Sequence, residues 1–159
     1  MSLQETKNSV LLALFEGYSE NPNGIYDLTG TITENGEDPH ELGKYLVDHG
    51  WVKNQQYRPS TFVCQITMAG INEVAPEYIQ DKTEQIISTL GINGGKESVM
   101  GILEFEPKDF QKAFDLVKHM EGTGFIKEGR YMAGDIIIEL SLEGREYYEE
   151  HKPNFLDLK

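Results

Sequence analysis

The stretch His49-Gly50-Trp51-Val52-Lys53 returns 74 residues later as Thr123-Gly124-Phe125-Ile126-Lys127. The correspondence continues at the same offset, without a gap, from Ile66-Thr67-Met68-Ala69-Gly70 to Leu140-Ser141-Leu142-Glu143-Gly144. Few of the matched pairs are identical, but most preserve physical character. A constant offset through a helix end, a hairpin and a helix start indicates that the chain contains one structural unit twice.

The repeat divides the chain into two predicted domains, residues 1–77 and 78–159. Domains this short bury only about 60% of the surface that the unfolded chain exposes, so each half is expected to be marginally stable alone. The chain is 38% hydrophobic and 26% charged, which is typical of a soluble globular protein.

In the first half, a stripe of apolar residues predicts a helix over Glu5–Glu16, which the breakers within Gly17–Gly24 should end. The mixed apolar stretch Ile25–Ile32 is interpreted as a short helix with an edge strand. Asp38 is expected to cap a helix that begins at Pro39 and ends at Gly50.

A hairpin is predicted next, with strands at Trp51–Lys53 and Thr61–Thr67. The polar segment Asn54–Ser60, which contains a proline, is expected to form its tip. Thr67 can then cap a short helix over Met68–Val74.

The second half predicts the same order of elements. A helix over Tyr78–Leu90 is expected to stop at Gly91–Gly95, followed by a short apolar element at Ser98–Phe105. Pro107 opens an amphipathic helix, and a hairpin is predicted over Phe125–Leu142.

Ser141 is expected to cap a last helix that runs to His151 and stops at Pro153. The segment beyond this proline carries the apolar residues Phe155, Leu156 and Leu158. Two interpretations stay open: the segment folds back onto the core, or it pairs with a second copy in a homodimer.

This order of elements resembles a winged helix-turn-helix domain, present as two tandem copies. The residues that carry the likeness are Gly50-Trp51-Val52-Lys53 with Ile66-Thr67-Met68-Ala69-Gly70, and their counterparts in the second half. They resemble the end of the wing in bacterial winged-helix transcriptional regulators of the multidrug-resistance and phenolic-acid kind. The resemblance implies an α+β fold in which each domain is a small helical bundle with a β-hairpin wing.

The resemblance also implies a function in binding double-stranded DNA. In such regulators the helix before the wing enters the major groove, and the wing contacts the backbone or the minor groove. By position, these helices are residues 40–49 and 108–119. The candidate DNA-binding residues are basic and amide side chains of these helices and wings, most of them in the second half: Lys44, Arg58, Lys108, Gln111, Lys112, Lys118, Lys127 and Arg130.

The charge of the chain favours a different interpretation. The formal net charge is −13, and a field of that sign repels phosphate backbones. The first of the two helices offers Lys44 and His40 against Glu37, Asp38, Glu41 and Asp48. In the second helix and its wing, acidic residues lie among the cations: Asp109, Asp115, Glu121 and Glu128. The alternative hypothesis is therefore an acidic protein-interaction module that keeps the winged-helix fold without DNA binding and contacts a basic partner or a second copy of itself.

Residues that would support an enzyme or a cofactor site are missing from the sequence. Cys64 is the single cysteine and lies in an apolar run, and the four histidines lack metal-ligand spacing. The segment Gly94–Ser98 lacks the glycine spacing and the final hydroxyl of a phosphate-binding loop. We therefore expect a non-enzymatic protein without cofactor or metal.

Two further expectations concern where the protein acts. No apolar run approaches the roughly 18 residues that a membrane-spanning helix needs, so no membrane partner is expected. The first residues, Met1–Glu5, lack the basic and apolar regions of a signal peptide. The cytoplasm is then the default compartment.

Overall fold

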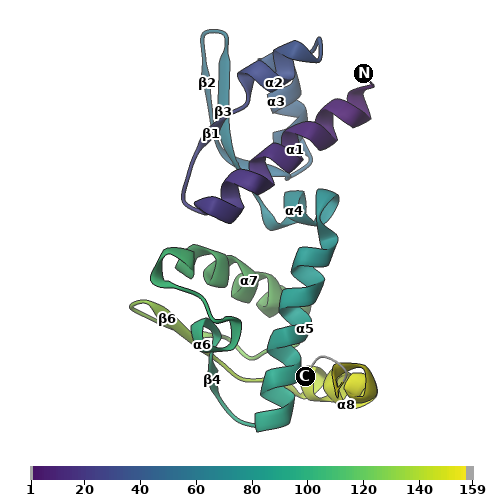
Figure 1. Ribbon diagram of the computed structural model, residues 1–159, viewed down its shortest axis with the longest axis vertical. Helices are drawn as coiled ribbons and strands as arrows, with labels where there is room; N and C mark the ends of the chain where they lie inside the picture. Colours follow the sequence, from purple (N-terminus) through teal and green to yellow (C-terminus); the bar gives the residue numbers. More distant parts are fainter. Residues whose placement is uncertain (1, 157–159) are drawn as a thin grey trace. The chain divides into compact units, whose positions relative to one another are not determined.

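The computed structural model describes the backbone of residues 2–156 and the side chains of residues 2–152 (Figure 1). This part of the chain is an α+β fold with eight α-helices and two three-stranded antiparallel sheets. It divides into two compact units, Met1–Tyr78 and Ile79–Lys159. The domain boundary predicted from the sequence lies one residue earlier.

The first unit alternates helices with a small sheet. Its elements are α1 (Leu3–Glu20), β1 (Tyr26–Asp27), α2 (Thr29–Glu34), α3 (Pro39–Asp48), β2 (Val52–Arg58), β3 (Thr61–Ile66) and α4 (Met68–Val74). The strands are arranged in the order β1-β3-β2. Figure 1 shows α2 and α3 on one side of the β2–β3 hairpin.

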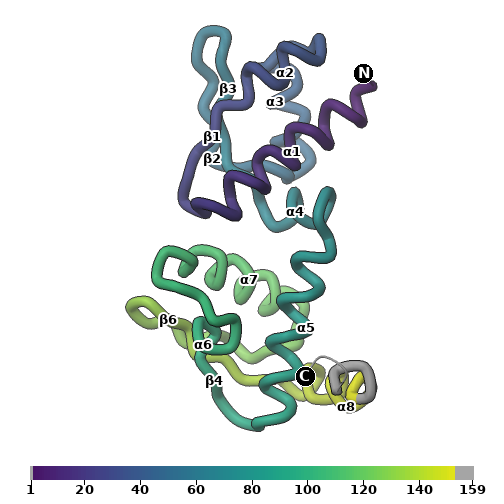
Figure 2. The backbone as a smooth tube through the Cα atoms, viewed as in Figure 1, coloured from purple at the N-terminus to yellow at the C-terminus, as the bar shows by residue number. Residues whose placement is uncertain are grey.

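The second unit repeats this order of elements (Figure 2). They are α5 (Pro76–Asn93), which begins before the boundary, β4 (Glu97–Ser98), α6 (Val99–Leu103), a 3-10 turn (Pro107–Asp109), α7 (Phe110–Thr123), β5 (Arg130–Met132), β6 (Asp135–Ile138) and α8 (Leu142–Leu156). The strand order β4-β6-β5 corresponds to that of the first sheet.

The repeated residues of the first unit form a compact junction between the hairpin and α4. The Thr67 backbone N–H donates to the Trp51 carbonyl over 3.0 Å, and the Thr67 hydroxyl donates to the Gly50 carbonyl over 2.6 Å. The same hydroxyl accepts from the Gly70 N–H at 3.0 Å, which caps α4 as predicted. A β-carbon on Gly70 would overlap the Trp51 carbonyl oxygen.

The second unit reproduces this junction with its own residues. The Ser141 N–H donates to the Phe125 carbonyl over 3.1 Å, and the Ser141 hydroxyl donates to the Gly124 carbonyl over 2.5 Å. The hydroxyl accepts from the Gly144 N–H at 3.0 Å. A β-carbon on Gly144 would overlap the Phe125 oxygen. The internal repeat of the sequence therefore corresponds to a repeat of the hydrogen bonds at this junction.

The buried side chains also match between the units. On the helix before the hairpin, Leu42 and Leu46 are buried in α3, and Leu116 and Met120, 74 residues later, are buried in α7. Cys64 is fully buried in β3, and this burial raises the pKa of its thiol to about 12. The thiol therefore packs as a small apolar group.

Several predicted element ends are confirmed and several are wrong. Asp38 caps α3 by accepting from the Glu41 N–H at 2.9 Å, as predicted. The helix α1 does not stop at Gly17 but continues to Glu20. The Tyr26 ring occupies the space beside Gly17, 2.7 Å from where a β-carbon would lie, and its hydroxyl donates to the Gly17 carbonyl. This glycine makes room for a ring rather than ending the helix.

The tip of the first hairpin is shorter than predicted. Within the expected tip Asn54–Ser60, the strand β2 continues to Arg58, because Gln56, Tyr57 and Arg58 still pair with β3. The register shifts between Lys53 and Gln56, where Asn54 takes a φ of 53°. Polar composition predicted a loop here, but pairing with the half-buried β3 keeps these residues extended.

Two helix ends in the second unit also differ from the prediction. The break expected over Gly91–Gly95 begins only at Gly94 and Gly95, whose φ values are 69° and 81°. Pro153 does not end α8, which continues to Leu156. The predictions for the apolar C-terminal segment concern residues beyond this description. Leu158 lies outside the described residues, and so do the side chains of Phe155 and Leu156.

Candidate nucleic-acid interface

The helix α7 separates an apolar face from a charged one. Its buried residues are Ala113, Leu116, Val117 and Met120. The opposite face carries the predicted residues Lys108, Gln111, Lys112 and Lys118, together with Asp115. At the start of the helix, the side chain of Glu106 accepts from the Asp109 N–H and that of Asp109 accepts from the Glu106 N–H. This capping box fixes where the charged face begins.

Two of the predicted lysines are paired at the start of α7. Lys108 Nζ lies 3.7 Å from a Glu106 oxygen, with 71% of the lysine side chain exposed. Lys112 Nζ lies 3.1 Å from Asp109, and only 14% of each side chain is exposed. Burial raises the pKa of Asp109, but the hydrogen bond and charge of Lys112 outweigh it, so that this pKa lies below its ordinary value.

Lys118 and Gln111 also have partners within the chain. Lys118 Nζ lies 3.5 Å from Glu121 and 4.6 Å from the centre of the Tyr131 ring. The hydrogen bond with Tyr131, aided by the charge of Glu121, raises the pKa of Lys118. Gln111 donates to Asp115 over 2.9 Å. The face is therefore charged but internally compensated.

In the first unit, the two predicted residues have a more acidic setting. Lys44 pairs with Asp48 over 3.0 Å, and both side chains are more than half exposed. Arg58 lies at the end of β2, where its guanidinium donates to Gln56. The exposed side of α3 also carries Glu41.

The remaining predicted residues, Lys127 and Arg130, lie together in the second unit. They line a hollow of about 300 Å³ over Ile137, and Lys96 lines it as well. We call Lys96, Lys127 and Arg130 the basic hairpin cluster. Lys127 is paired with Glu139. The hydrogen bond and charge of Lys127, with a contribution from Lys96, hold the pKa of that carboxyl below its ordinary value.

Sequence reasoning missed Lys96. The antiparallel pairing of Glu97 with Ile138 brings this lysine to β6, although about 40 residues separate them in the chain. Nothing in the local sequence signals that pairing, because β4 is only two residues long.

The basic hairpin cluster and the charged face of α7 lie on different sides of the second sheet. Tyr131 faces α7, because its ring lies 5.5 Å from that of Phe114. Adjacent residues of a strand point to opposite faces, so Arg130 points away from α7. The predicted DNA-binding residues of this unit therefore form two surfaces rather than one.

A second residue missed from the sequence is Glu121, near the end of α7. Its carboxylate accepts from the Gly129 N–H at 2.7 Å and from the Tyr131 hydroxyl at 2.9 Å. Burial raises the pKa of Glu121, but these hydrogen bonds and the Lys118 charge lower it below its ordinary value. Glu121 thus ties the helix to the hairpin that follows it.

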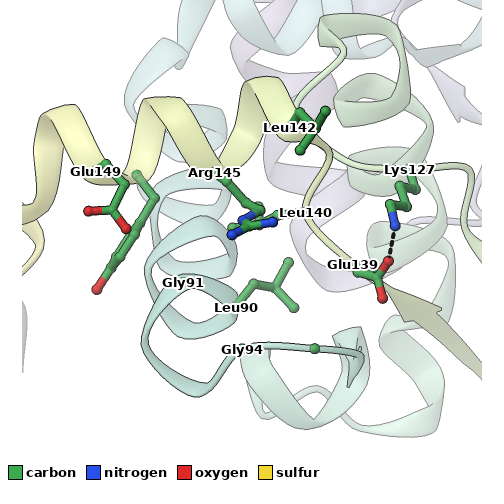
Figure 3. A pocket seen from close by; sticks show the side chains of 11 residues that line it. Leu90, Gly91, Gly94, Lys127, Glu139, Leu140, Leu142, Arg145 and Glu149 are labelled. Carbon is green, nitrogen blue, oxygen red and sulfur yellow. Dashed lines mark hydrogen bonds and ion pairs between the residues drawn. The ribbon is translucent and has the colours of Figure 1, made fainter.

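The second unit also has a pocket of about 720 Å³ beside the start of α8 (Figure 3). Its floor is apolar, with Leu90, Leu140 and Tyr148, and its edge carries Arg145 and Glu149. Sequence reasoning did not predict this pocket.

Among the described residues, no group of three or more histidine, cysteine or acidic side chains is placed to hold a metal ion. Within the same part of the chain, no helix has both the length and the apolar character required to cross a membrane. A comparison with family models, with curated proteins and with solved structures found no match for this chain.

Proposed function

We propose that both units are winged-helix units and that the second binds double-stranded DNA through the exposed face of α7, as a non-enzymatic transcriptional regulator acting in the cytoplasm. The order of helix, strand, two helices, hairpin and helix supports the winged-helix assignment. A fold alone does not determine function. The proposal therefore rests on one observation about charge.

That observation is the difference between two helices in equivalent places. Along α7 and the turn before it, Lys108, Lys112 and Lys118 each lie beside an acidic partner, but Lys108 and Lys118 have more than half of their side chains exposed. The corresponding face of α3 carries Lys44 among Glu37, Glu41 and Asp48. The α7 surface therefore offers more exposed lysines to phosphate groups than the α3 face does.

The ion pairs on α7 do not prevent such contacts. Lys108 and Lys118 are more than half exposed, and an ion pair as exposed as Lys108–Glu106 contributes only about 0–1 kcal/mol. A DNA phosphate can replace the carboxylate partner, and release of counterions from the DNA adds a favourable term that is largest at low salt.

The test measures affinity for a fluorescently labelled random-sequence duplex by anisotropy at about 20 mM salt, where screening is weak. We expect K108E/K118E to abolish binding, because it replaces the two exposed lysines of this surface with carboxylates. The matched control K44E/R58E makes the same charge change in the first unit and should bind as the wild type does. Unchanged affinity of K108E/K118E, with an unchanged denaturation midpoint, would refute the assignment of this face.

A third variant, K127E/R130E, reports on the hairpin. Because these residues point away from α7, we expect a smaller loss of affinity than in K108E/K118E. A larger loss would move the DNA-binding surface from the helix to the basic hairpin cluster.

The second candidate function is a protein-interaction module that keeps this fold without DNA binding. It is favoured by the separation of the cations onto two faces of the sheet and by the acidic surface of α3. Its partner would be a basic protein surface or a second copy of the chain. This candidate predicts no binding of duplex DNA by the wild type even at about 20 mM salt, so the same titration separates the two functions.

A further inference from the structure

The pocket of the second unit lies between the end of α5, the end of β6 and the start of α8 (Figure 3). Its volume of about 720 Å³ falls within the usual range of small-molecule sites. Its lining combines the apolar residues Leu90, Leu140 and Tyr148 with the charged residues Arg145 and Glu149.

The internal repeat explains why there is space at this place. Buried Val10, Leu11 and Leu14 of α1 correspond, 76 residues later, to buried Ile86, Ile87 and Leu90 of α5. At the same offset, the buried Tyr18 corresponds to Gly94. The first unit has a ring where the second has no side chain.

A second replacement also removes a core side chain from this place in the second unit. At the offset of 74 residues, Ile71 of α4 corresponds to Arg145 of α8. Ile71 is fully buried, and α4 packs directly against α1. Arg145 is exposed and lines the pocket instead. The second unit has thus replaced two core side chains with a glycine and a cation.

The floor of the pocket suits an apolar group. Leu90, Leu140 and Tyr148 all line the pocket and are each at most 6% exposed. The Tyr148 ring rests against the α5 backbone at Gly91, where any β-carbon would overlap it. At the edge, Leu142 has 76% of its surface exposed, although it is a large apolar residue.

The charges at the opening suit a single negative group. The Arg145 side chain extends into the pocket from α8 (Figure 3), and it forms no ion pair with any described residue. Lys127, in contrast, is already paired with Glu139. Glu139 and Glu149 both line the pocket, and their charges would repel a ligand with two or more negative charges.

We propose that this pocket binds an amphipathic monocarboxylate with an aliphatic body. The ligand carboxylate lies against the Arg145 guanidinium, whose two parallel N–H groups match its two oxygens. The aliphatic chain covers Leu90, Leu140 and the Tyr148 ring, and it removes part of the Leu142 surface from water. The site is distinct from the α7 face and does not depend on DNA binding.

The first test is calorimetric titration of the whole chain with decanoate. We expect saturable binding, weakened about 10- to 100-fold in R145Q, which removes a charge-assisted hydrogen-bond pair. R145K should lie between the two, because an ammonium lacks the planar pair of donors. The control R58Q removes an arginine of the first unit and should bind decanoate as the wild type does.

A second variant, L142E, distinguishes a loss of binding from a folding defect. Leu142 is so exposed that L142E should leave the denaturation midpoint unchanged, while it adds a carboxylate at the edge of the pocket and weakens decanoate binding. In amide NMR spectra, decanoate should shift the resonances of Gly91, Gly94 and Gly95, which surround the opening.

Three comparisons would overturn the proposal: no heat and no NMR shifts with decanoate, an unchanged affinity in R145Q, or equal binding of the uncharged decanol. Tighter binding of decyl phosphate would contradict the argument from Glu139 and Glu149. None of these measurements contains DNA, so their failure would leave the DNA-binding proposal standing, and the reverse also holds.

Discussion

In the first unit, the helix before the hairpin exposes Glu41 and Asp48 around Lys44, whereas in the second unit the equivalent helix exposes Lys108 and Lys118. The backbone order around both helices is the same. Most of the buried apolar positions and both glycine-hydroxyl junctions have been kept, while the exposed residues have diverged in charge. The comparison shows that the interior defines the unit and the surface defines what each copy can contact.

The attachment of the hairpin to this helix differs as well. In the first unit, His40 Nε2 donates to the carbonyls of Arg58 and Thr61, at 2.7 and 3.0 Å. In the second unit, Glu121 accepts instead from the Gly129 N–H, just before β5, and from the Tyr131 hydroxyl. The attachment is thus made by a donor at the start of the helix in one unit and by an acceptor near its end in the other.

The interiors also differ at a polar pair. Lys7 is 1% exposed, pairs with Glu73 over 2.6 Å and lies 4.8 Å from the centre of the Trp51 ring. At the matching offsets, the second unit has Thr83 and Tyr147. The first unit therefore depends on a buried charge that the second does without.

The largest expected effect concerns the two junctions. G70A and G144A should each destabilise the chain by roughly 2–4 kcal/mol, because the new methyl group would overlap a backbone carbonyl that cannot turn away. Chemical denaturation measures both. The control G122A, at a helical glycine with open space around it, should be neutral or slightly stabilising. Tolerance of one alanine and not the other would break the equivalence of the two units.

The buried pair is expected to give the next largest effect. E73Q should lower the free energy of unfolding by about 2 kcal/mol, because it leaves the Lys7 ammonium buried without a carboxylate. Replacement of Lys7 by methionine should cost less, since Glu73 is partly exposed and can be solvated. Equal losses for the two variants, measured by urea denaturation, would argue against this account of the pair.

A smaller effect is expected at Glu121, and it should depend on pH. The folded pKa of this carboxyl lies below its ordinary value of about 4.5, so its stabilisation is present above that pH and is lost as the pH falls through the lowered folded pKa. E121Q should cost about 1 kcal/mol at pH 7, and the difference from the wild type should shrink below pH 4. A difference that stays constant from pH 7 to pH 3 would show that charge is not involved.

The smallest effect is expected at His40, because this side chain is exposed. H40A should cost about 0.5 kcal/mol, as an exposed hydrogen bond does. Hydrogen exchange should still accelerate at the amides of Arg58 and Thr61 relative to those of the second hairpin. Equal exchange in the variant and the wild type would remove His40 from the attachment.

The features predicted correctly from the sequence are local ones. The caps at Asp38 and Thr67 depend on a carboxylate or hydroxyl three residues before an N–H. This spacing is visible in the sequence itself. The basic hairpin cluster could not be predicted, because Lys96 reaches Lys127 only through strand pairing. The pocket could not be predicted either, since the space beside Gly94 depends on how α5 and α8 pack.

The most direct test of the central claim, that the α7 face of the second unit meets DNA phosphates, is the salt dependence of duplex binding. Contacts from the two exposed lysines, Lys108 and Lys118, predict a slope of log K against log salt of about −1.8 in the wild type, since each phosphate contact contributes about −0.9. The variant K108Q/K118Q should bring the slope close to zero. A wild-type slope near zero, or a slope that K108Q/K118Q leaves unchanged, would contradict the account.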